Sequence, residues 1–168
     1  MEKVILVDDA DNEIGTEEKI EAHKKALLHR ALSICVFNDK GEMLIQKRNI
    51  NKYHSGGLWA NTCCSHPRPN EKTEDAAHRR LVEEMGFDCK LEEKMHFIYF
   101  AKLDHGLTEH ELDHLFIGRY NGEVKPDPNE VEDYKWISLE ELKKDMQGHG
   151  DKYTAWFKII VKKLDEKN

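Results

Sequence analysis

The sequence predicts a single α+β domain built around a mixed or mainly antiparallel sheet. Segments typical of strands outnumber segments typical of helices, and hairpin signals outnumber the pattern of parallel βαβ units. The 168 residues contain no internal repeat, low-complexity tract or linker rich in Pro, Gly and Ser that would divide them. With 39% hydrophobic and 35% charged residues, the chain has the composition of a globular protein, and disorder is not expected.

The expected strands are short β-prone segments bounded by turn signals. Residues 31–37 are apolar, and the turn-forming segment 38–41 separates them from residues 43–47, which predicts a hairpin. Residues 58–64 form another short candidate strand that ends just before a Ser-His-Pro sequence. Further strands are expected at residues 97–103, 115–120 and 133–137.

Three segments have helical patterns. The clearest spans residues 74–85, with Thr73 as the expected N-cap and Gly86 at the position where helices commonly end in glycine. A short helix is expected at residues 139–146. A terminal amphipathic helix is indicated by apolar side chains that share one face, namely Trp156, Ile160, Val161 and Leu164.

Charge and hydropathy exclude several classes of protein. The net charge of −7 argues against sequence-independent binding of nucleic acid, which relies on an excess of Lys and Arg. Residues 4–7 are the only apolar run near the start, whereas a secretory signal needs about 7–15 apolar residues. No stretch approaches the roughly 20 residues that cross a bilayer. The four cysteines do not resemble a disulfide framework, because Cys63 and Cys64 are adjacent. We therefore expect a cytoplasmic protein without nucleic-acid or membrane partners; its oligomeric state stays open.

Three histidines and two carboxylates form a candidate metal site. Glu109 and Glu111 are two residues apart, so on a strand both side chains point the same way. Imidazole combined with carboxylate suits a first-row transition ion. Ordinary exposed or core histidines are the alternative interpretation, because ten histidines offer many triplets. The candidate histidines are His23, His29 and His66; no role is expected for His54, His78, His96, His105, His110, His114 and His149.

The predicted helix at residues 74–85 carries a second pattern. Arg79 and Glu83, like Arg80 and Glu84, are i,i+4 pairs, so a salt-bridged solvated face is one interpretation. The segment also resembles the Nudix signature, a metal-diphosphate motif, which it matches at Glu71, Arg79, Glu83, Glu84 and Gly86. It departs from that signature at Ser65, which replaces a glycine, and at Arg80, which replaces a glutamate. A cation in place of a metal-binding carboxylate is expected to weaken a hydrolytic site.

A closer resemblance extends over most of the chain. The segment 59–67 (WANTCCSHP) resembles that of type I isopentenyl-diphosphate Δ-isomerases, which have a Nudix fold. Further matching segments occur in the same order as in that family, at residues 19–23, 46–48 and 108–111 and, more loosely, 154–156. The resemblance implies a single Nudix-like domain, with a core at about residues 29–165 and ligands from the segment before it. It also implies an isomerase that interconverts isopentenyl and dimethylallyl diphosphate.

The resemblance assigns a role to each matching residue. Cys64 and Glu111 match the catalytic pair, and Tyr99 matches a tyrosine beside the catalytic carboxylate. Cys63 is the rival thiol, but on a strand it faces the other way. The family's substrate-binding positions are matched by Lys19, Arg48, Lys52, Arg80 and Trp156. The ligands of a transition ion, Mn²⁺ or Zn²⁺, are matched by His23, His29, His66, Glu109 and Glu111, and that of Mg²⁺ by Glu84.

Two other functions are left open. A Nudix-type diphosphate hydrolase is the main alternative, although Arg80 disfavours it. The third is a non-catalytic metal- or diphosphate-binding module, which would have no need of a thiol close to the candidate ligand His66.

Overall fold

A nine-stranded sheet organises the part of the chain that the computed structural model describes, residues 1–166. Its central strand β3 (His29–Phe37) runs antiparallel to β1 (Lys3–Val7), β4 (Glu42–Arg48) and β6 (Cys63–Ser65). It runs parallel to β8 (Thr108–Arg119), so the sheet is mixed but mainly antiparallel, which confirms the expected class. The remaining strands are β2 (Glu13–Glu18), β5 (Trp59–Ala60), β7 (Leu91–Lys102) and β9 (Val131–Ser138).

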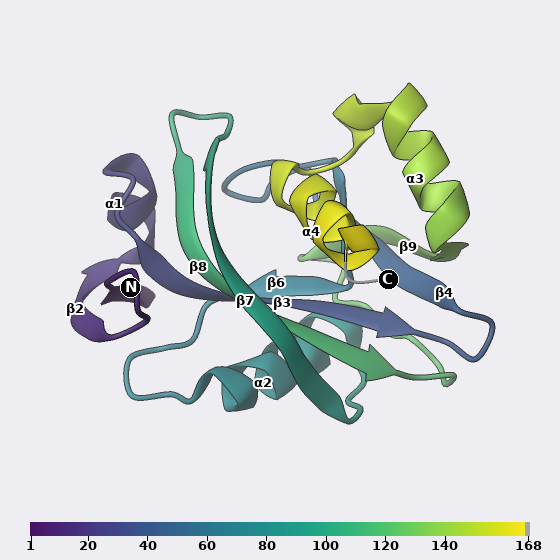
Figure 1. Ribbon diagram of the computed structural model, residues 1–168, viewed down its shortest axis with the longest axis horizontal. Coiled ribbons are helices and arrows are strands. Elements are labelled where there is room, and N and C mark those ends of the chain that lie inside the picture. The colour runs from purple at the N-terminus through teal and green to yellow at the C-terminus, as the bar shows by residue number, and fades with distance from the viewer. Residues whose placement is uncertain (167–168) are drawn as a thin grey trace.

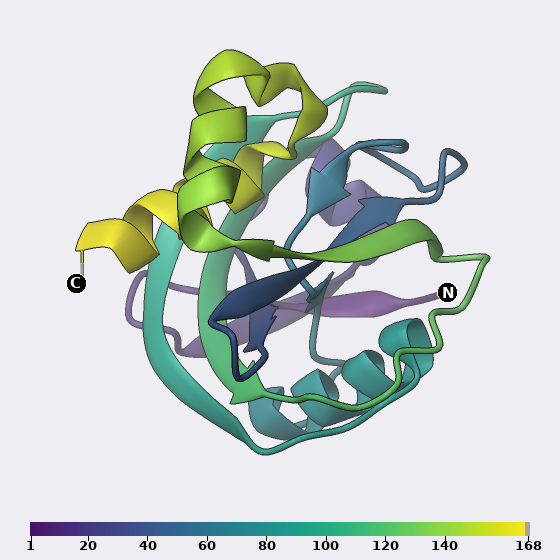
Figure 2. The same cartoon turned by 90° about the vertical axis from the view of Figure 1, so that its right-hand side faces the viewer.

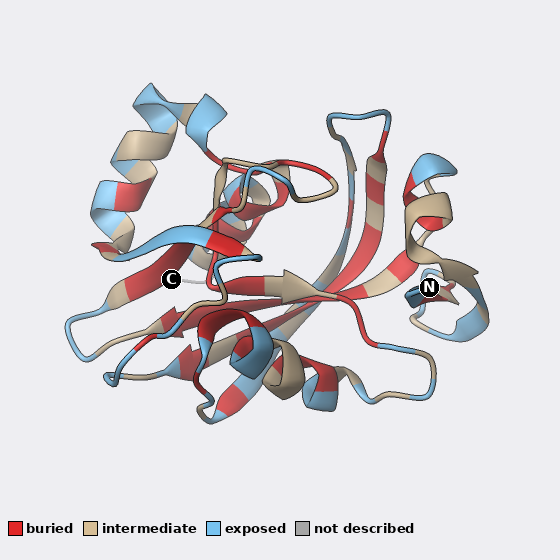
Figure 3. Cartoon of the chain, turned by 180° about the vertical axis from the view of Figure 1, so that it is seen from behind, coloured by how far each residue is buried: buried red, intermediate tan, exposed pale blue. Residues whose placement is uncertain are grey.

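Helices cover both faces of this sheet. The helix α2 (Thr73–Met85) lies on one side, and α3 (Leu139–Gly148) and α4 (Ala155–Glu166) lie on the other (Figure 1, Figure 2). Alternation along β3 supplies both cores: Leu32 and Ile34 pack with α2, and Cys35 packs with α4. Burial is accordingly concentrated in the central strands, while the connecting loops are largely exposed (Figure 3).

The polar residues in the middle of the predicted strand 58–64 divide it into β5 and β6. Asn61 and Thr62 are fully buried. The Asn61 amide donates to the carbonyl of Ile34 over 3.0 Å, and the Thr62 hydroxyl donates to the carbonyl of Leu44 over 2.6 Å. These side-chain hydrogen bonds replace backbone hydrogen bonds between strands at this point. The backbone then continues into β6, which carries Cys63 and Cys64.

The structure extends the sequence expectations in the N-terminal segment and the β7–β8 hairpin. The strands β1 and β2 and the helix α1 (Lys19–Lys24), where Glu18 accepts from two backbone amides, were not predicted. The strands β7 and β8 begin earlier than expected, because β7 includes the charged run at residues 92–94 and β8 includes the alternating carboxylates Glu109, Glu111 and Asp113. The cap of α2 was predicted wrongly. Lys72, with extended dihedral angles, is the N-cap, and Thr73 already lies in the helix.

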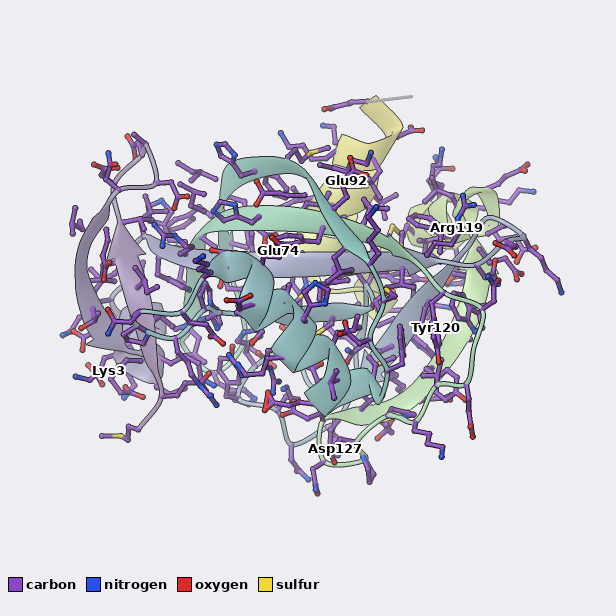
Figure 4. The ribbon with its side chains drawn as sticks, turned by 90° about the horizontal axis from the view of Figure 1, so that it is seen from below. Lys3, Glu74, Glu92, Arg119, Tyr120 and Asp127 are labelled. Atoms are coloured by element: carbon purple, nitrogen blue, oxygen red, sulfur yellow. The ribbon has the colours of Figure 1, made fainter. Side chains whose placement is uncertain are left out.

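The termination of α2 follows the prediction. Gly86 has a φ of +74°, and its amide donates to the carbonyl of Val82. The following chain crosses this end of the helix, where the amides of Lys125 and Asp127 donate to the carbonyls of Met85 and Glu84 (Figure 4). Across residues 1–166, every helix is too short or too polar to span a bilayer.

Replacing Gly86 by alanine is expected to destabilise the fold for two reasons. The left-handed φ costs an alanine about 1–2 kcal/mol. A new Cβ would also collide with the backbone carbonyl of Lys125, and crowding of this kind adds about 1–3 kcal/mol. The matched control is Gly106→Ala, where φ is +71° but no atom of residues 1–166 lies within 4 Å of the Cβ. Urea unfolding should therefore show a larger loss of free energy for G86A than for G106A, and equal losses would contradict the structure.

Candidate active site

The candidate ligands converge at one end of the sheet, on the face covered by α4. The parallel register of β3 and β8 sets His29 directly opposite Glu111. His66 immediately follows β6, and His23 lies on α1, which stands beside this end of β8 (Figure 1). Glu109 and Glu111 are both 4% exposed and are contacted by the same tyrosine, Tyr99, as their spacing predicts. Four separate elements thus bring the five residues together.

One carboxylate oxygen of Glu111 is the centre of this cluster. It lies 2.9 Å from His66 Nε2, 3.0 Å from His29 Nε2 and 3.9 Å from His23 Nε2. The three rings are nearly or fully buried. The ligand atoms of these four residues all lie within 4.8 Å of one another, which is a separation that a single metal ion can bridge.

Backbone contacts orient two of the rings for metal binding. His23 Nδ1 lies 2.7 Å from the carbonyl of Lys19, and His29 Nδ1 lies 2.9 Å from the carbonyl of Leu27. Since a carbonyl can only accept, each Nδ1 carries a proton, and Nε2 is the nitrogen of each ring that faces Glu111. His23 Nε2 is buried and has no hydrogen-bond partner within the described chain. This orphaned nitrogen, with the mixed imidazole and carboxylate donors, fits a first-row transition ion.

Burial and Glu111 act in opposite directions on the histidines: burial lowers the pKa of His29, but its hydrogen bond with Glu111 outweighs burial and raises it. Burial lowers the pKa of His23 and of His66 to about 4, so both rings are neutral at pH 7. Burial raises the pKa of Glu111, but its hydrogen bonds with His29 and His66 outweigh burial and hold it well below the usual range. The pKa of Glu109 is raised by burial and by the charge of Glu111. Glu111 is therefore the more readily ionised member of the carboxylate pair.

Tyr99 joins the two carboxylates. Its hydroxyl lies 2.6 Å from an oxygen of Glu111 and 2.9 Å from an oxygen of Glu109, and both can accept its proton. The pairing of β7 with β8 places Tyr99 directly opposite Glu111. Burial and the two neighbouring charges raise the pKa of Tyr99 well above its usual value, so the phenol remains a donor.

Cys64 and Cys63 face opposite sides of the sheet. Cys63 is 1% exposed and packs in the core beneath α2, whereas Cys64 borders the same cavity as Glu111. The Trp156 indole donates to Cys64 Sγ over 3.0 Å, and the thiol donates to Asn61 Oδ1 over 3.0 Å. Burial raises the pKa of Cys64 well above its usual value, so Cys64 is a thiol at neutral pH.

The cavity that these residues border has a volume of about 740 Å³ and a basic rim. Lys19, Arg48, Lys52 and Arg80 all border it. Lys19 pairs with Glu2, Lys52 with Glu130, and Arg80 with Glu84. Arg48 differs, because its Nε is buried with no hydrogen-bond partner among residues 1–166. This side chain therefore retains a donor for a ligand anion.

Glu84, the residue matched to Mg²⁺, lies behind this rim. It is 2% exposed and accepts from the Gln46 amide over 2.9 Å and from Arg80 over 2.6 Å. It meets the cavity through Arg80, which borders it. A single carboxylate that is completed by substrate oxygens fits the way proteins usually bind Mg²⁺.

The other positions of the Nudix signature form a clamp within the structure. Arg79 makes two hydrogen bonds to Glu71, over 2.8 and 2.9 Å, and a third to Glu83 over 2.9 Å. Within residues 1–166, no group of three potential metal ligands includes Glu71, Glu83 or Glu84. The salt-bridged interpretation of the helix therefore describes Arg79 and its partners well.

His54 is the residue at this site that sequence reasoning missed. It is 1% exposed and borders the cavity, with Nε2 at 3.4 Å from Glu109 Oε2. It lies in the loop between β4 and β5, where no periodicity marks it. Other histidines do have structural partners; His114, for example, contacts Asp11 and Glu93. The cavity is also bordered by Glu2, Tyr53 and Glu130, for which no role was expected.

Comparison with known proteins shows that the chain is similar in sequence to a group of enzymes. The chain matches the family model described as NUDIX domain over residues 27–157. It is 50% identical over 163 residues to isopentenyl-diphosphate Delta-isomerase 2 of Aromatoleum aromaticum, which covers 97% of this chain and 86% of that protein. Isopentenyl-diphosphate Delta-isomerase 2 of Photorhabdus laumondii is 52% identical over 163 residues, with coverages of 97% and 92%.

Solved structures share the fold at much lower identity. A crystal structure of DR0079 from Deinococcus radiodurans matches with a TM-score of 0.80 and 15% identity, covering 96% of this chain and 98% of that one. The MutT protein from Methanosarcina mazei matches with a TM-score of 0.68 and 22% identity, covering 84% and 95%. These similarities confirm the expected Nudix-like arrangement of sheet and helices.

The clamp around Arg79 generates a pH-dependent prediction. The bonds from Arg79 lower the pKa of Glu71 below its usual value, so the clamp contributes stability above the unfolded pKa of about 4.3. That contribution is lost as the pH falls through the folded pKa. We expect Glu71→Gln to lower the free energy of unfolding by about 1 kcal/mol at pH 7, because it weakens a partly buried, charge-assisted pair.

The measurement is urea unfolding of both proteins from pH 7 to pH 3. The difference in unfolding free energy between wild type and E71Q should shrink as the pH falls below about 4.3. Glu83→Gln is the matched control: this more exposed carboxylate makes one hydrogen bond to Arg79 and a longer one, 3.2 Å, to Arg80, so its loss should cost less. A difference that is independent of pH would contradict the clamp.

Proposed function

Because the chain belongs to the isopentenyl-diphosphate Delta-isomerase family of NUDIX-domain proteins, we propose that it interconverts isopentenyl diphosphate and dimethylallyl diphosphate. The observation that carries the proposal is the joint position of Cys64 and Glu111. A protonated thiol and an ionised carboxylate border one cavity, whose rim is basic. The activity would serve the synthesis of isoprenoid precursors in the cytoplasm, without nucleic-acid or membrane partners.

The chemistry requires a proton donor and a proton acceptor at the same alkene. An unactivated alkene is a very weak base, so the donor must be held against it and the resulting tertiary cation kept from water. Of Cys64 and Glu111, one gives a proton to the alkene and the other removes one from the cation; the roles exchange with the direction of reaction. In the resting protein Cys64 holds its proton and Glu111 does not, while Tyr99 donates to Glu111.

We assign a transition ion, Mn²⁺ or Zn²⁺, to the buried cluster. The residues that would hold it are His23, His29, His66, Glu109 and Glu111. When bound, the ion supplies positive charge beside Glu111, which favours the ionised carboxylate. Independently of the ion, the backbone contacts of His23 and His29 already fix the rings with Nε2 facing Glu111.

The diphosphate is proposed to bind at the basic rim. Arg48, whose Nε has no hydrogen-bond partner among the described residues, is suited to a phosphate oxygen, and Lys19, Lys52 and Arg80 add charge. Glu84 would hold the proposed Mg²⁺, which would supply positive charge to the diphosphate. In an acidic protein, this set of cations is local to one cavity.

Trp156 is proposed to act on both the thiol and the cation. Its indole N–H donates to Cys64, which keeps the sulfur oriented, and the residue borders the cavity. An aromatic face attracts a desolvated cation by about 2 kcal/mol or more. The helix α4 that carries it is anchored in the core by Phe157 and Ile160, so the ring is held firmly.

The alternatives have less support. A Nudix hydrolase needs carboxylates where this chain has Arg80, and Glu71 and Glu83 are bonded to Arg79. A binding module would have no use for the thiol. Incubating the protein with isopentenyl diphosphate, Mg²⁺ and Mn²⁺ in D₂O, followed by NMR, separates the three functions. Deuterated dimethylallyl diphosphate is the expected product; release of phosphate or monophosphate would favour the hydrolase, and unchanged but bound substrate the binding module.

The two adjacent cysteines provide a matched pair of variants. Cys64→Ala removes the proposed proton-transfer group and should lower kcat by at least about 10²-fold, the usual contribution of general acid–base catalysis. Cys63→Ala removes only a core sulfur on the other face of the sheet, so its kcat should stay within a few-fold of wild type. The NMR assay above measures both. A C64A protein that isomerises at the wild-type rate would overturn the mechanism.

Arg48 provides a separate prediction for substrate binding. Arg48→Lys retains the charge but loses the planar donor pattern that suits phosphate. We expect KM for isopentenyl diphosphate to rise by about tenfold, equivalent to about 1.4 kcal/mol, with a smaller change in kcat. Arg119→Lys, at an exposed position outside the cavity, is the control and should leave KM unchanged. An unaltered KM in R48K would remove Arg48 from the diphosphate site.

A further inference from the structure

His54 is enclosed between His23 of the proposed metal cluster and Trp156, which also borders the cavity. Its ring centroid lies 5.7 Å from that of His23 on one side and 5.4 Å from that of Trp156 on another. Its backbone carbonyl accepts from Arg48 over 3.0 Å. The residue is 1% exposed, so the ring is removed from water on all sides but still borders the cavity.

One nitrogen of this ring has no partner. His54 Nδ1 lies 3.0 Å from the Ser55 hydroxyl, whereas Nε2 is buried without a hydrogen bond to any described residue. His23 Nε2 is also buried without a hydrogen bond to any described residue, and the two rings are neighbours. Buried nitrogens rarely stay unpaired unless a ligand or water completes them. Two adjacent orphaned nitrogens that face a pair of carboxylates therefore indicate a shared ligand.

The loop geometry holds the ring in this place. Ser55 has a φ of +54°, a strained value for a non-glycine residue, and its amide donates to Asp104 Oδ1 over 2.9 Å. Asp104 lies at the tip of the β7–β8 hairpin, the same hairpin that carries Tyr99, Glu109 and Glu111. The loop that aims His54 is thus anchored to the element that supplies the carboxylates.

The separations fall in two groups that share His23, and within each group they are those of neighbouring ligands on an ion. Two donors at right angles, each about 2.1 Å from an ion, lie about 3 Å apart. Glu111 Oε2 lies 3.0 Å from His29 Nε2, and Glu109 Oε2 lies 3.4 Å from His54 Nε2. The ligand atoms of His23, His54 and Glu109 also lie within 4.8 Å of one another. This group shares His23 with the cluster around Glu111.

We propose that His54 is a fourth histidine ligand of the transition ion, next to Glu109. This inference rests on the proposed metal site. Together with the three histidines and two glutamates already assigned, it brings the protein donors to six, the number that an octahedral ion takes. No position is then left for water or substrate. The ion would then influence the reaction only through its ligand Glu111, and the alkene would contact side chains and not the ion. A fourth nitrogen donor also favours transition ions over Mg²⁺.

The number of histidine nitrogens on the ion tests the proposal directly. Wild-type protein, freed of metal and loaded with Mn²⁺ alone, would be examined by pulsed EPR for coupled imidazole nitrogens. Four nitrogens support the proposal, and three overturn it. This measurement needs no variant and no substrate, so it gives an answer even if isomerase activity is absent. A protein that does not bind Mn²⁺ would overturn both this inference and the proposed metal site, while leaving the isomerase assay to judge the function.

Affinity provides the second measurement. We expect His54→Gln to weaken Co²⁺ binding, measured by competition with a chelator, by at least about tenfold. It should also remove one coupled nitrogen from the Mn²⁺ spectrum. His149→Gln, at an exposed position, is the matched control and should change neither value. An H54Q protein with lower affinity but the wild-type nitrogen count would show that His54 only positions Glu109, which overturns the ligand assignment, as would unchanged affinity.

Discussion

The buried charge of Glu111 is the constraint on which the site depends. A carboxylate that is 4% exposed must be compensated, because an unpaired buried charge costs several kcal/mol. Tyr99 donates to one of its oxygens, and His29 and His66 contact the other. These partners come from three different strands or their ends, so the sheet has to form correctly before the charge is stabilised. The parallel pairing of β3 with β8 sets this register, since a slip of one residue would turn Glu111 to the opposite face.

The same constraint explains how an acidic protein offers a basic cavity. Of the basic residues assigned to the diphosphate, Lys19, Lys52 and Arg80 are already paired with carboxylates, those of Glu2, Glu130 and Glu84. These acidic residues neutralise the rim when no diphosphate is present, which limits the repulsion among its cations. Arg48 is held differently, by the carbonyl of His54 and by the face of Trp156 at 5.0 Å. The basic rim and the metal cluster therefore meet at the loop between β4 and β5.

Local pattern predicted those parts of the molecule that depend on periodicity. The core of β3, the hairpin to β4 and the helix α2 follow from apolar alternation and a terminal glycine, and the spacing of Glu109 and Glu111 follows from a strand. The strand β2 escaped prediction because only one residue of its sequence EIGTEE is strongly apolar and none is fully buried. His54 escaped because its position depends on the left-handed Ser55 and on Asp104, which is 49 residues further along the chain. No local pattern encodes such a contact.

Two neighbouring arginines on α2 have different roles. Arg79 keeps the contacts of the Nudix signature, and Arg80 faces the cavity. Arg79 still joins Glu71 to Glu83, so that part of the Nudix signature serves to hold the loop before α2 against the helix. One residue later, Arg80 faces Glu84, Glu130 and the cavity, where a hydrolase would place another carboxylate. A guanidinium there repels metal ions and attracts phosphate, so metal ions beyond the one proposed at Glu84 are disfavoured and the intact diphosphate is retained. Retention of the diphosphate is what an isomerase requires, because its substrate must keep the group that a hydrolase would remove.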